Sequence, residues 1–232
     1  MAGPILSPYL GPGDGEDSAP ALLNPILFAV CLTGWLLSWA YCFWTTGGNI
    51  HLWGNSPKIS NLHSVPLCAL ALLSVRRVVS ERVPLAFSLA FFATDLLDCV
   101  VRRDLPFLLH AILSIALNVG AAALPGHPLH ELRSLSKGFL VEASTIFLNR
   151  WKRTHRREDY VTFFAVFTVC RIVWVPCFVY EMYTAVGEVD AICLVSAAFY
   201  VLQLAWYAKM ISILRNYRVP AQVKLAKEDK EA

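Results

Sequence analysis

The chain alternates long apolar blocks with short polar segments. A helix that crosses a bilayer needs about 20 predominantly apolar residues, because the hydrocarbon core is about 30 Å thick. On this criterion the pattern predicts seven membrane-spanning helices. They are Leu22–Trp44, Leu62–Val79, Pro84–Val101, Leu105–Leu124, Gly138–Asn149, Tyr160–Tyr180 and Ala191–Leu214. The fifth is too short to cross unless flanking turns extend it.

Composition agrees with a membrane protein. Hydrophobic residues make up 56% of the 232 residues and charged residues 16%, whereas soluble domains carry about 25% charged residues. Pattern and composition together predict an all-α fold, a multi-pass transmembrane helical bundle. They exclude a soluble globular domain. No folded basic domain is present to bind nucleic acid, so no nucleic-acid partner is expected.

The polar segments divide the chain into four parts. Residues 1–21 form an acidic lead rich in Pro and Gly, which we expect to be disordered, and residues 22–60 hold the first helix and a loop. Residues 61–218 hold the other six helices as one membrane domain, and residues 219–232 form a charged tail. The lead lacks the basic n-region of a signal peptide, so we expect the first helix to stay uncleaved.

Positive charge is distributed unevenly over the two sides that seven spans define. One side collects thirteen Lys and Arg residues and the other five, while two lie within spans. Because basic residues accumulate on the cytoplasmic side, we expect the C-terminus in the cytosol and the N-terminus in a lumen or outside the cell. The basic run Asn149–Asp159 is either an ordinary cytosolic loop or a patch for anionic lipids, to which each basic residue contributes about 1 kcal/mol.

Six of the ionisable side chains within the apolar helices are the candidate functional residues. They are His63, Asp95, Asp98, His110, Glu142 and Arg171. Such groups cost about 2.5–3.5 kcal/mol each in a membrane helix and usually face the protein interior. Asp95 and Asp98 are three residues apart, which puts both on one helix face. We therefore expect the six to converge on one internal cavity, with His63 at its mouth.

The chemistry of this set stays open from the residues alone. An aspartate could orient His110 as a general base, which would make His110, Asp95 and Asp98 the catalytic residues of an enzyme. The polar groups could instead bind a lipid, or satisfy one another, with Arg171 paired to Glu142 or to one of the two aspartates. No segment has the dense His/Asp spacing of a metal site, and the seven cysteines lie in predicted spans as small apolar residues. No metal or other cofactor is therefore expected.

Five segments, taken in order, resemble a known family. They read LHSVP (62–66), TDLLDCVVRRDLPFLLHA (94–111), GFLVEASTIFLNRW (138–151), FTVCRIVWVP (167–176) and VLQLAWYAKMI (201–211). This order resembles the TLC-domain family, named for translocating-chain-associated, longevity-assurance and ceroid-lipofuscinosis membrane proteins. The resemblance implies a bundle of six transmembrane helices around a central cavity, here with one extra helix in front.

The resemblance also implies lipid chemistry. Family members reside mainly in the endoplasmic reticulum or plasma membrane, and one branch, the ceramide synthases, transfers an acyl chain from acyl-CoA to a sphingoid base. Those enzymes carry adjacent histidines, followed by several acidic residues on the next helix. Here His110 is followed by Ala111, and the next helix keeps only Glu142. The chain resembles more closely the non-synthase members, which adjust membrane phospholipid composition and fluidity.

Three functions follow from the resemblance. The first is a membrane protein that binds a lipid or acyl chain in its bundle cavity, through the six ionisable residues, and regulates membrane lipid composition. The second is an acyl-CoA-dependent N-acyltransferase in which His110 acts as base or transient acyl acceptor. The third is a structural or cargo-handling protein of the endoplasmic reticulum. Membrane lipids are the expected partners, and a homo- or hetero-oligomer stays open. The endoplasmic reticulum is the expected membrane, with the plasma membrane as the alternative.

Overall fold

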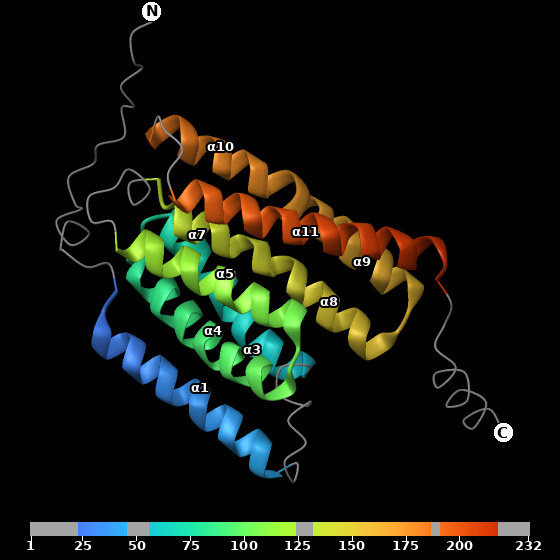
Figure 1. Ribbon diagram of the computed structural model, residues 1–232, viewed down its shortest axis with the longest axis horizontal. Coiled ribbons are helices and arrows are strands. Elements are labelled where there is room, and N and C mark those ends of the chain that lie inside the picture. Colours follow the sequence, from blue (N-terminus) through green and yellow to red (C-terminus); the bar gives the residue numbers. More distant parts are fainter. Residues whose placement is uncertain (1–22, 46–55, 124–131, 187–190, 218–232) are drawn as a thin grey trace, which may run out of the picture.

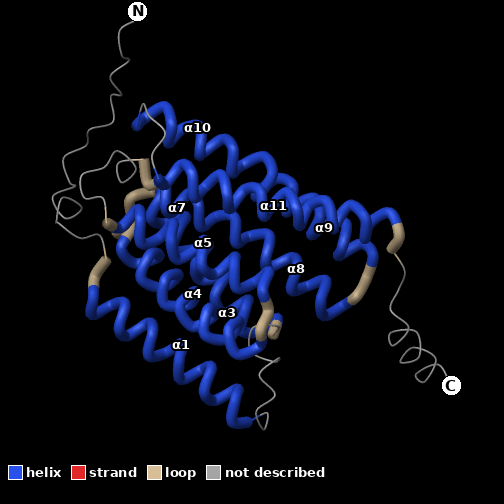
Figure 2. The backbone as a smooth tube through the Cα atoms, viewed as in Figure 1, coloured by secondary structure: helices blue, strands red, loops and turns tan. Residues whose placement is uncertain are grey.

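The computed structural model describes residues 23–45, 56–123, 132–186 and 191–217, and all regular structure in these ranges is helical (Figure 2). The helices pack as one bundle (Figure 1). This confirms the all-α, multi-pass fold that the sequence predicts. The expected acidic lead and charged tail lie outside the described residues.

In the described part of the chain the helices form seven runs, one for each predicted span. The single-helix runs are α1 (Pro25–Thr45), α3 (Pro57–Val75), α4 (Arg82–Arg102), α5 (Leu105–Ala122) and α11 (Ala191–Arg215). The composite runs are α7 (Ser134–Phe139), η1 (Leu140–Glu142) and α8 (Ala143–Thr154), then α9 (Arg157–Phe167), η2 (Thr168–Val173) and α10 (Trp174–Val186). Five runs are long and apolar enough to cross a bilayer, and α5 is apolar but shorter.

The fifth run differs most from its prediction. It is helical from Ser134 to Thr154, whereas the apolar pattern predicted only Gly138–Asn149. Polar turns at both ends continue the helix, and at about 1.5 Å per residue the run reaches the thickness of a hydrocarbon core of about 30 Å. The run ends at His155, which adopts a left-handed backbone with φ 50°.

The exposure pattern is the inverse of that in a soluble protein. Large apolar side chains cover the outer faces of the helices; Ile26 and Trp44, for example, are 76% and 86% exposed. Polar side chains fill much of the interior, and Ser88 and Gln203 are fully buried. In water so extensive an apolar surface would aggregate, whereas a bilayer is the solvent that suits it. The protein is therefore an integral membrane protein.

Helix α1 lies at one edge of the bundle and packs along α4 (Figure 1). The Trp35 ring contacts Phe87 and Phe91 of α4 at centroid distances of 5.5 Å and 5.1 Å. Most of the remaining α1 surface is exposed, and the helix carries no charged residue. Lipid is therefore its main neighbour.

The two ends of the bundle differ in charge. Helices α1, α4, α8 and α11 finish at one end, where α3, α5 and α9 begin (Figure 1). Basic residues gather there: Lys58, Arg102, Arg103, Arg150, Lys152, Arg153, Arg156, Arg157 and Arg215. We call this the basic end.

Candidate functional site

A cavity of about 530 Å³ lies inside the bundle, bordered by α3, α4, α5, η1, α8, α9, η2 and α11. His63, Asp95, His110, Glu142 and Arg171 line it. These are five of the six ionisable residues that the sequence singles out, and they come from five different helical segments. Aromatic rings line the same space, so the cavity combines polar groups with apolar surface. Its volume falls in the range of about 300–1,000 Å³ that is usual for small-molecule sites.

Glu142 and Arg171 form the polar centre of the cavity. Arg171 Nη2 donates to Glu142 Oε1 at 3.0 Å, and both side chains are buried. Arg171 also donates from Nε to Ser144 Oγ at 2.8 Å and from Nη1 to Gln203 Oε1 at 3.0 Å. Thr145 donates to the other carboxylate oxygen of Glu142 at 2.8 Å. These hydrogen bonds offset the cost of desolvating the two charges. The ion pair between Arg171 and Glu142 is one of the pairings that the sequence leaves open.

A π-helical turn positions Arg171. The turn, Thr168–Val173, joins α9 to α10. Pro176 follows it closely, and a proline has no N–H to offer the carbonyl four residues earlier and crowds that carbonyl with its ring. The carbonyl belongs to Ile172, and Tyr200 Oη donates to its oxygen instead at 3.1 Å. Such turns are frequent at functional sites, and this one carries Arg171 into the cavity wall.

His63 lies in the cavity wall among aromatic rings. It stacks on Phe91 with a centroid distance of 3.7 Å and an interplanar angle of 9°, and Trp35 of α1 approaches it edge-on at 6.2 Å. The residue is 2% exposed, so it is embedded in the wall rather than placed at an open mouth. Its Nε2 is buried and has no hydrogen-bond partner among the described residues.

His110 of α5 also lies in aromatic surroundings. Phe199 and Trp206 of α11 each approach it at a centroid distance of 5.3 Å. Its buried Nδ1 has no hydrogen-bond partner in the described ranges, and no hydrogen bond there joins it to Asp95 or Asp98. The carboxylate-oriented histidine of a general base is therefore not formed by these residues. The described residues also include no group of three or more His, Cys, Asp and Glu side chains that could hold a metal ion.

Asp95 and Asp98 face different neighbours although both belong to α4. Asp95 lines the cavity and makes no hydrogen bond or ion pair with any described residue. Asp98 is fully buried outside the cavity lining, where Arg102 Nε donates to it at 2.6 Å and Trp39 Nε1 donates at 3.0 Å. Three residues turn a helix through about 300°, so the two side chains diverge by about 60°. One can therefore face the cavity while the other faces α1.

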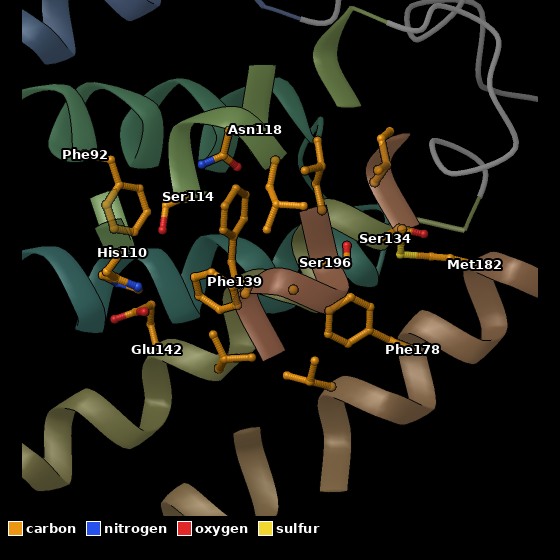
Figure 3. Close-up of a pocket in the computed structure, with 17 residues that line it drawn as sticks. Phe92, His110, Ser114, Asn118, Ser134, Phe139, Glu142, Phe178, Met182 and Ser196 are labelled. Atoms are coloured by element: carbon orange, nitrogen blue, oxygen red, sulfur yellow. The ribbon is translucent and has the colours of Figure 1, made fainter. Parts of the chain in front are cut away.

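A smaller apolar pocket of about 100 Å³ adjoins the cavity. Phe92, His110 and Glu142 line both spaces and so form the boundary between them. Figure 3 shows His110 and Glu142 at one end of the pocket and Phe178 and Met182 at the other. The polar cavity thus continues into an apolar pocket that leads away from the basic end.

Lys152 and Lys209 line the cavity toward the basic end. Neither forms an ion pair within the described residues. Lys152 is half-buried and lies three residues beyond the predicted span Gly138–Asn149. An anionic group near this end of the cavity would therefore be attracted.

The sequence did not single out four residues of this region, the cavity lysines Lys152 and Lys209 and the hydrogen-bonding residues Gln203 and Trp39. Gln203 is fully buried in α11 and accepts a hydrogen bond from Arg171. A lone glutamine within an apolar span was the feature of the sequence that could have identified it. Trp39 donates to Asp98, but a tryptophan in a predicted membrane helix is ordinary and carries no such signal. Both contacts depend on which helices become neighbours.

Comparison with known proteins gives one match. A family model described as the TLC domain matches residues 28–212, from within α1 to near the end of α11. The match thus includes the leading helix as well as the six helices after it. No curated protein and no solved structure shows significant similarity to the chain.

Proposed function

The chain belongs to the TLC-domain family, whose model spans residues 28–212, and on this premise we propose that it binds a lipid or acyl chain in its bundle cavity. Through that binding it regulates the lipid composition of the membrane in which it sits. Membership of this family suggests a lipid-related function. The bound lipid rests on the geometry of the site, and the regulatory role rests on the resemblance to family members that adjust membrane phospholipid composition.

One observation carries the proposal: a polar cavity and an apolar pocket meet at His110 and Glu142. A lipid presents the same order of chemistry, a polar group followed by an apolar chain. The wall of the cavity also holds nitrogens of His63 and His110 that have no hydrogen-bond partner in the part of the chain that the structure describes. A buried polar group without a partner costs about 1–3 kcal/mol, and a hydroxyl, ester or amide of the ligand would satisfy these nitrogens.

We also propose an orientation and a compartment. The basic end faces the cytosol, because Lys and Arg gather there, and the N-terminus faces a lumen or the outside. The expected membrane is the endoplasmic reticulum, in keeping with the family resemblance, and the plasma membrane is the alternative. In this orientation the lysines of the cavity lie near the cytosolic leaflet, and membrane lipids are the partners, with no cofactor.

Filling the apolar pocket tests the proposal. Gly138 lines this pocket, and a Cβ added there would lie 3.8 Å from Phe178, which is an ordinary contact. A Gly138→Leu side chain would therefore enter the pocket and occupy the space for an acyl chain. Native mass spectrometry should detect a single-chain lipid on the wild-type protein and at least about tenfold less on the variant, a difference of about 1.4 kcal/mol.

Gly34→Leu on α1 is the matched control. A Cβ at Gly34 meets nothing within 4 Å, and both substitutions replace a helical glycine by the same residue. If the wild type binds no lipid, or if both variants bind equally well, binding in this pocket is refuted. In cells the phospholipid acyl composition should shift with the wild type and Gly34→Leu but not with Gly138→Leu, which tests the regulatory role.

The position of His110 favours a second candidate, an acyl-CoA-dependent N-acyltransferase. Its unpartnered Nδ1 lies where the polar cavity meets the apolar pocket. In such a reaction an amine nitrogen attacks the thioester carbonyl, the carbon–sulfur bond breaks, and His110 carries the amine's proton to the departing thiolate. Purified protein given acyl-CoA and a long-chain amine should then form an amide and free CoA. His110→Ala should abolish both products, and a wild type that forms neither amide nor acyl adduct excludes this candidate.

A further inference from the structure

Asp95 differs from the other buried carboxylates of the described residues. Glu81, Asp98, Glu142 and Asp159 each accept at least one hydrogen bond from the protein. Asp95 is 9% exposed, lines the cavity and accepts none from any described residue. A buried carboxylate without a cation is costly in surroundings of low dielectric constant. A ligand that carries a positive charge would compensate it.

The same cavity also holds positive charge without an anionic partner. Lys152 and Lys209 line it, and neither has an ion pair within the described ranges. Neither lysine reaches Asp95 closely enough to form a salt bridge. A negative and a positive charge therefore face one cavity without forming a pair. A ligand that carries both a cation and an anion would complement them.

The three chemical features follow a fixed order along the bundle. Phe92 borders the apolar pocket, and Asp95 lies three residues further along α4, or about 4.5 Å nearer the basic end. Lys152 lies ten residues beyond Glu142, or about 15 Å along its helical run, and its side chain lines the cavity as well. From the inside outward the order is apolar pocket, unpaired carboxylate and unpaired amine among the described residues; Asp104 also lines the cavity near the basic end, but it pairs with Arg102.

Resting on the lipid binding proposed above, we propose that the ligand is a single-chain lipid with an ammonium next to its chain and a phosphate beyond the ammonium. A phosphorylated long-chain amino alcohol has this order. Asp95 binds the ammonium, and Lys152 and Lys209 bind the phosphate. Phe92 and Phe107 line the same space, and aromatic rings stabilise a desolvated cation further.

Other lipid classes match this arrangement less well. In a diacyl phospholipid with an amino headgroup the ammonium lies outside the phosphate, which reverses the order. A fatty acid offers no cation to Asp95, and a neutral lipid compensates neither sign. Only a chain that carries its ammonium inside its phosphate places each charge opposite its partner.

The test compares three probes by equilibrium binding to the full-length protein in lipid nanodiscs. They are a long-chain amino-alcohol phosphate, its N-acetylated form, which lacks the ammonium, and its dephosphorylated form. The wild type should bind the first probe at least about tenfold more tightly than each of the others. Asp95→Asn should abolish the preference over the N-acetylated form, and Lys152→Gln combined with Lys209→Gln should abolish the preference over the dephosphorylated form.

The same series of variants includes controls for correct folding. Asp95→Asn removes an uncompensated charge, so the unfolding temperature should stay unchanged or rise. Asp159→Asn changes a buried carboxylate outside the cavity lining and should leave all three affinities in their wild-type ratio.

The outcomes also separate the two proposals. If the wild type binds all three probes equally, or if Asp95→Asn keeps the wild-type preference, the amino-phosphate ligand is refuted while lipid binding stands. If the wild type binds no probe and carries no other lipid, both proposals are refuted.

Discussion

Trp39 and Asp98 join the first helix to the rest of the bundle. The indole Nε1 donates to Asp98 Oδ1 at 3.0 Å, while Arg102 Nε donates to the other oxygen at 2.6 Å. The carboxylate is thus compensated by one cation and one neutral donor. Because Asp98 does not line the cavity, we infer that it stabilises helix packing rather than contacting a ligand.

Trp39→Phe should weaken the attachment of α1. It removes a hydrogen bond to a charged acceptor, and such bonds contribute about 1.5–3 kcal/mol. We expect a loss near the lower end of that range, measured as the free energy of unfolding in mixed detergent micelles. Trp44→Phe is the control, because Trp44 is 86% exposed and should change stability by less than about 0.5 kcal/mol. Equal effects of the two substitutions would contradict the role of this bond.

Arg171→Met should be far more damaging. It leaves Glu142 buried without its cation, and breaking a buried pair in this way costs about 3–5 kcal/mol. The same unfolding assay measures the loss. Adding Glu142→Gln to Arg171→Met should recover part of it, because the amide carries no charge to compensate. A double variant as unstable as the sum of the two single variants would show that the ions are not coupled.

The proposed orientation predicts which positions can be glycosylated. The chain contains no Asn-x-Ser/Thr sequon, so any glycan must be attached to the inserted sequon. A sequon placed within residues 1–22 should acquire a glycan in microsomes, whereas one placed after Arg215 should not. A gel-mobility shift that glycosidase treatment reverses measures the modification. The opposite result would invert the orientation.

The helices could be predicted because each membrane span is a continuous apolar stretch of the sequence. Each predicted apolar block corresponds to one helical run, and for every block except the short fifth one a stretch of about 20 apolar residues suffices to identify a span. The ends were harder to predict. Ser134–Lys137 and Arg150–Thr154 contain several polar residues, yet they extend the fifth run, because a helix continues wherever no residue breaks it.

The members of the site could be predicted better than their contacts. Ionisable residues inside spans face the protein, which is why five of the six line one cavity. Which hydrogen-bond partner each of these side chains finds depends on how the helices pack, and the spacing of residues in the sequence does not reveal that packing. Arg171 reaches Glu142 through a π-helical turn next to Pro176, and Asp98 turns away from Asp95 because Arg102 and Trp39 bind it.

Helix α1 has no charge and few neighbours, so it can settle in lipid before the bundle exists. Helix α4 cannot, because Asp95 would meet hydrocarbon at a cost of about 2.5–3.5 kcal/mol, and Asp98 would keep only its ion pair with Arg102 of the same helix. Biogenesis therefore has a built-in order, in which α1 anchors the nascent chain and α4 leaves the translocon only when neighbouring helices cover its charges. A chain truncated just after α4 should persist in translocon crosslinks, whereas one truncated after α1 should not. Substitutions that uncover Asp98 would then act first on membrane quality control and only afterwards on lipid binding.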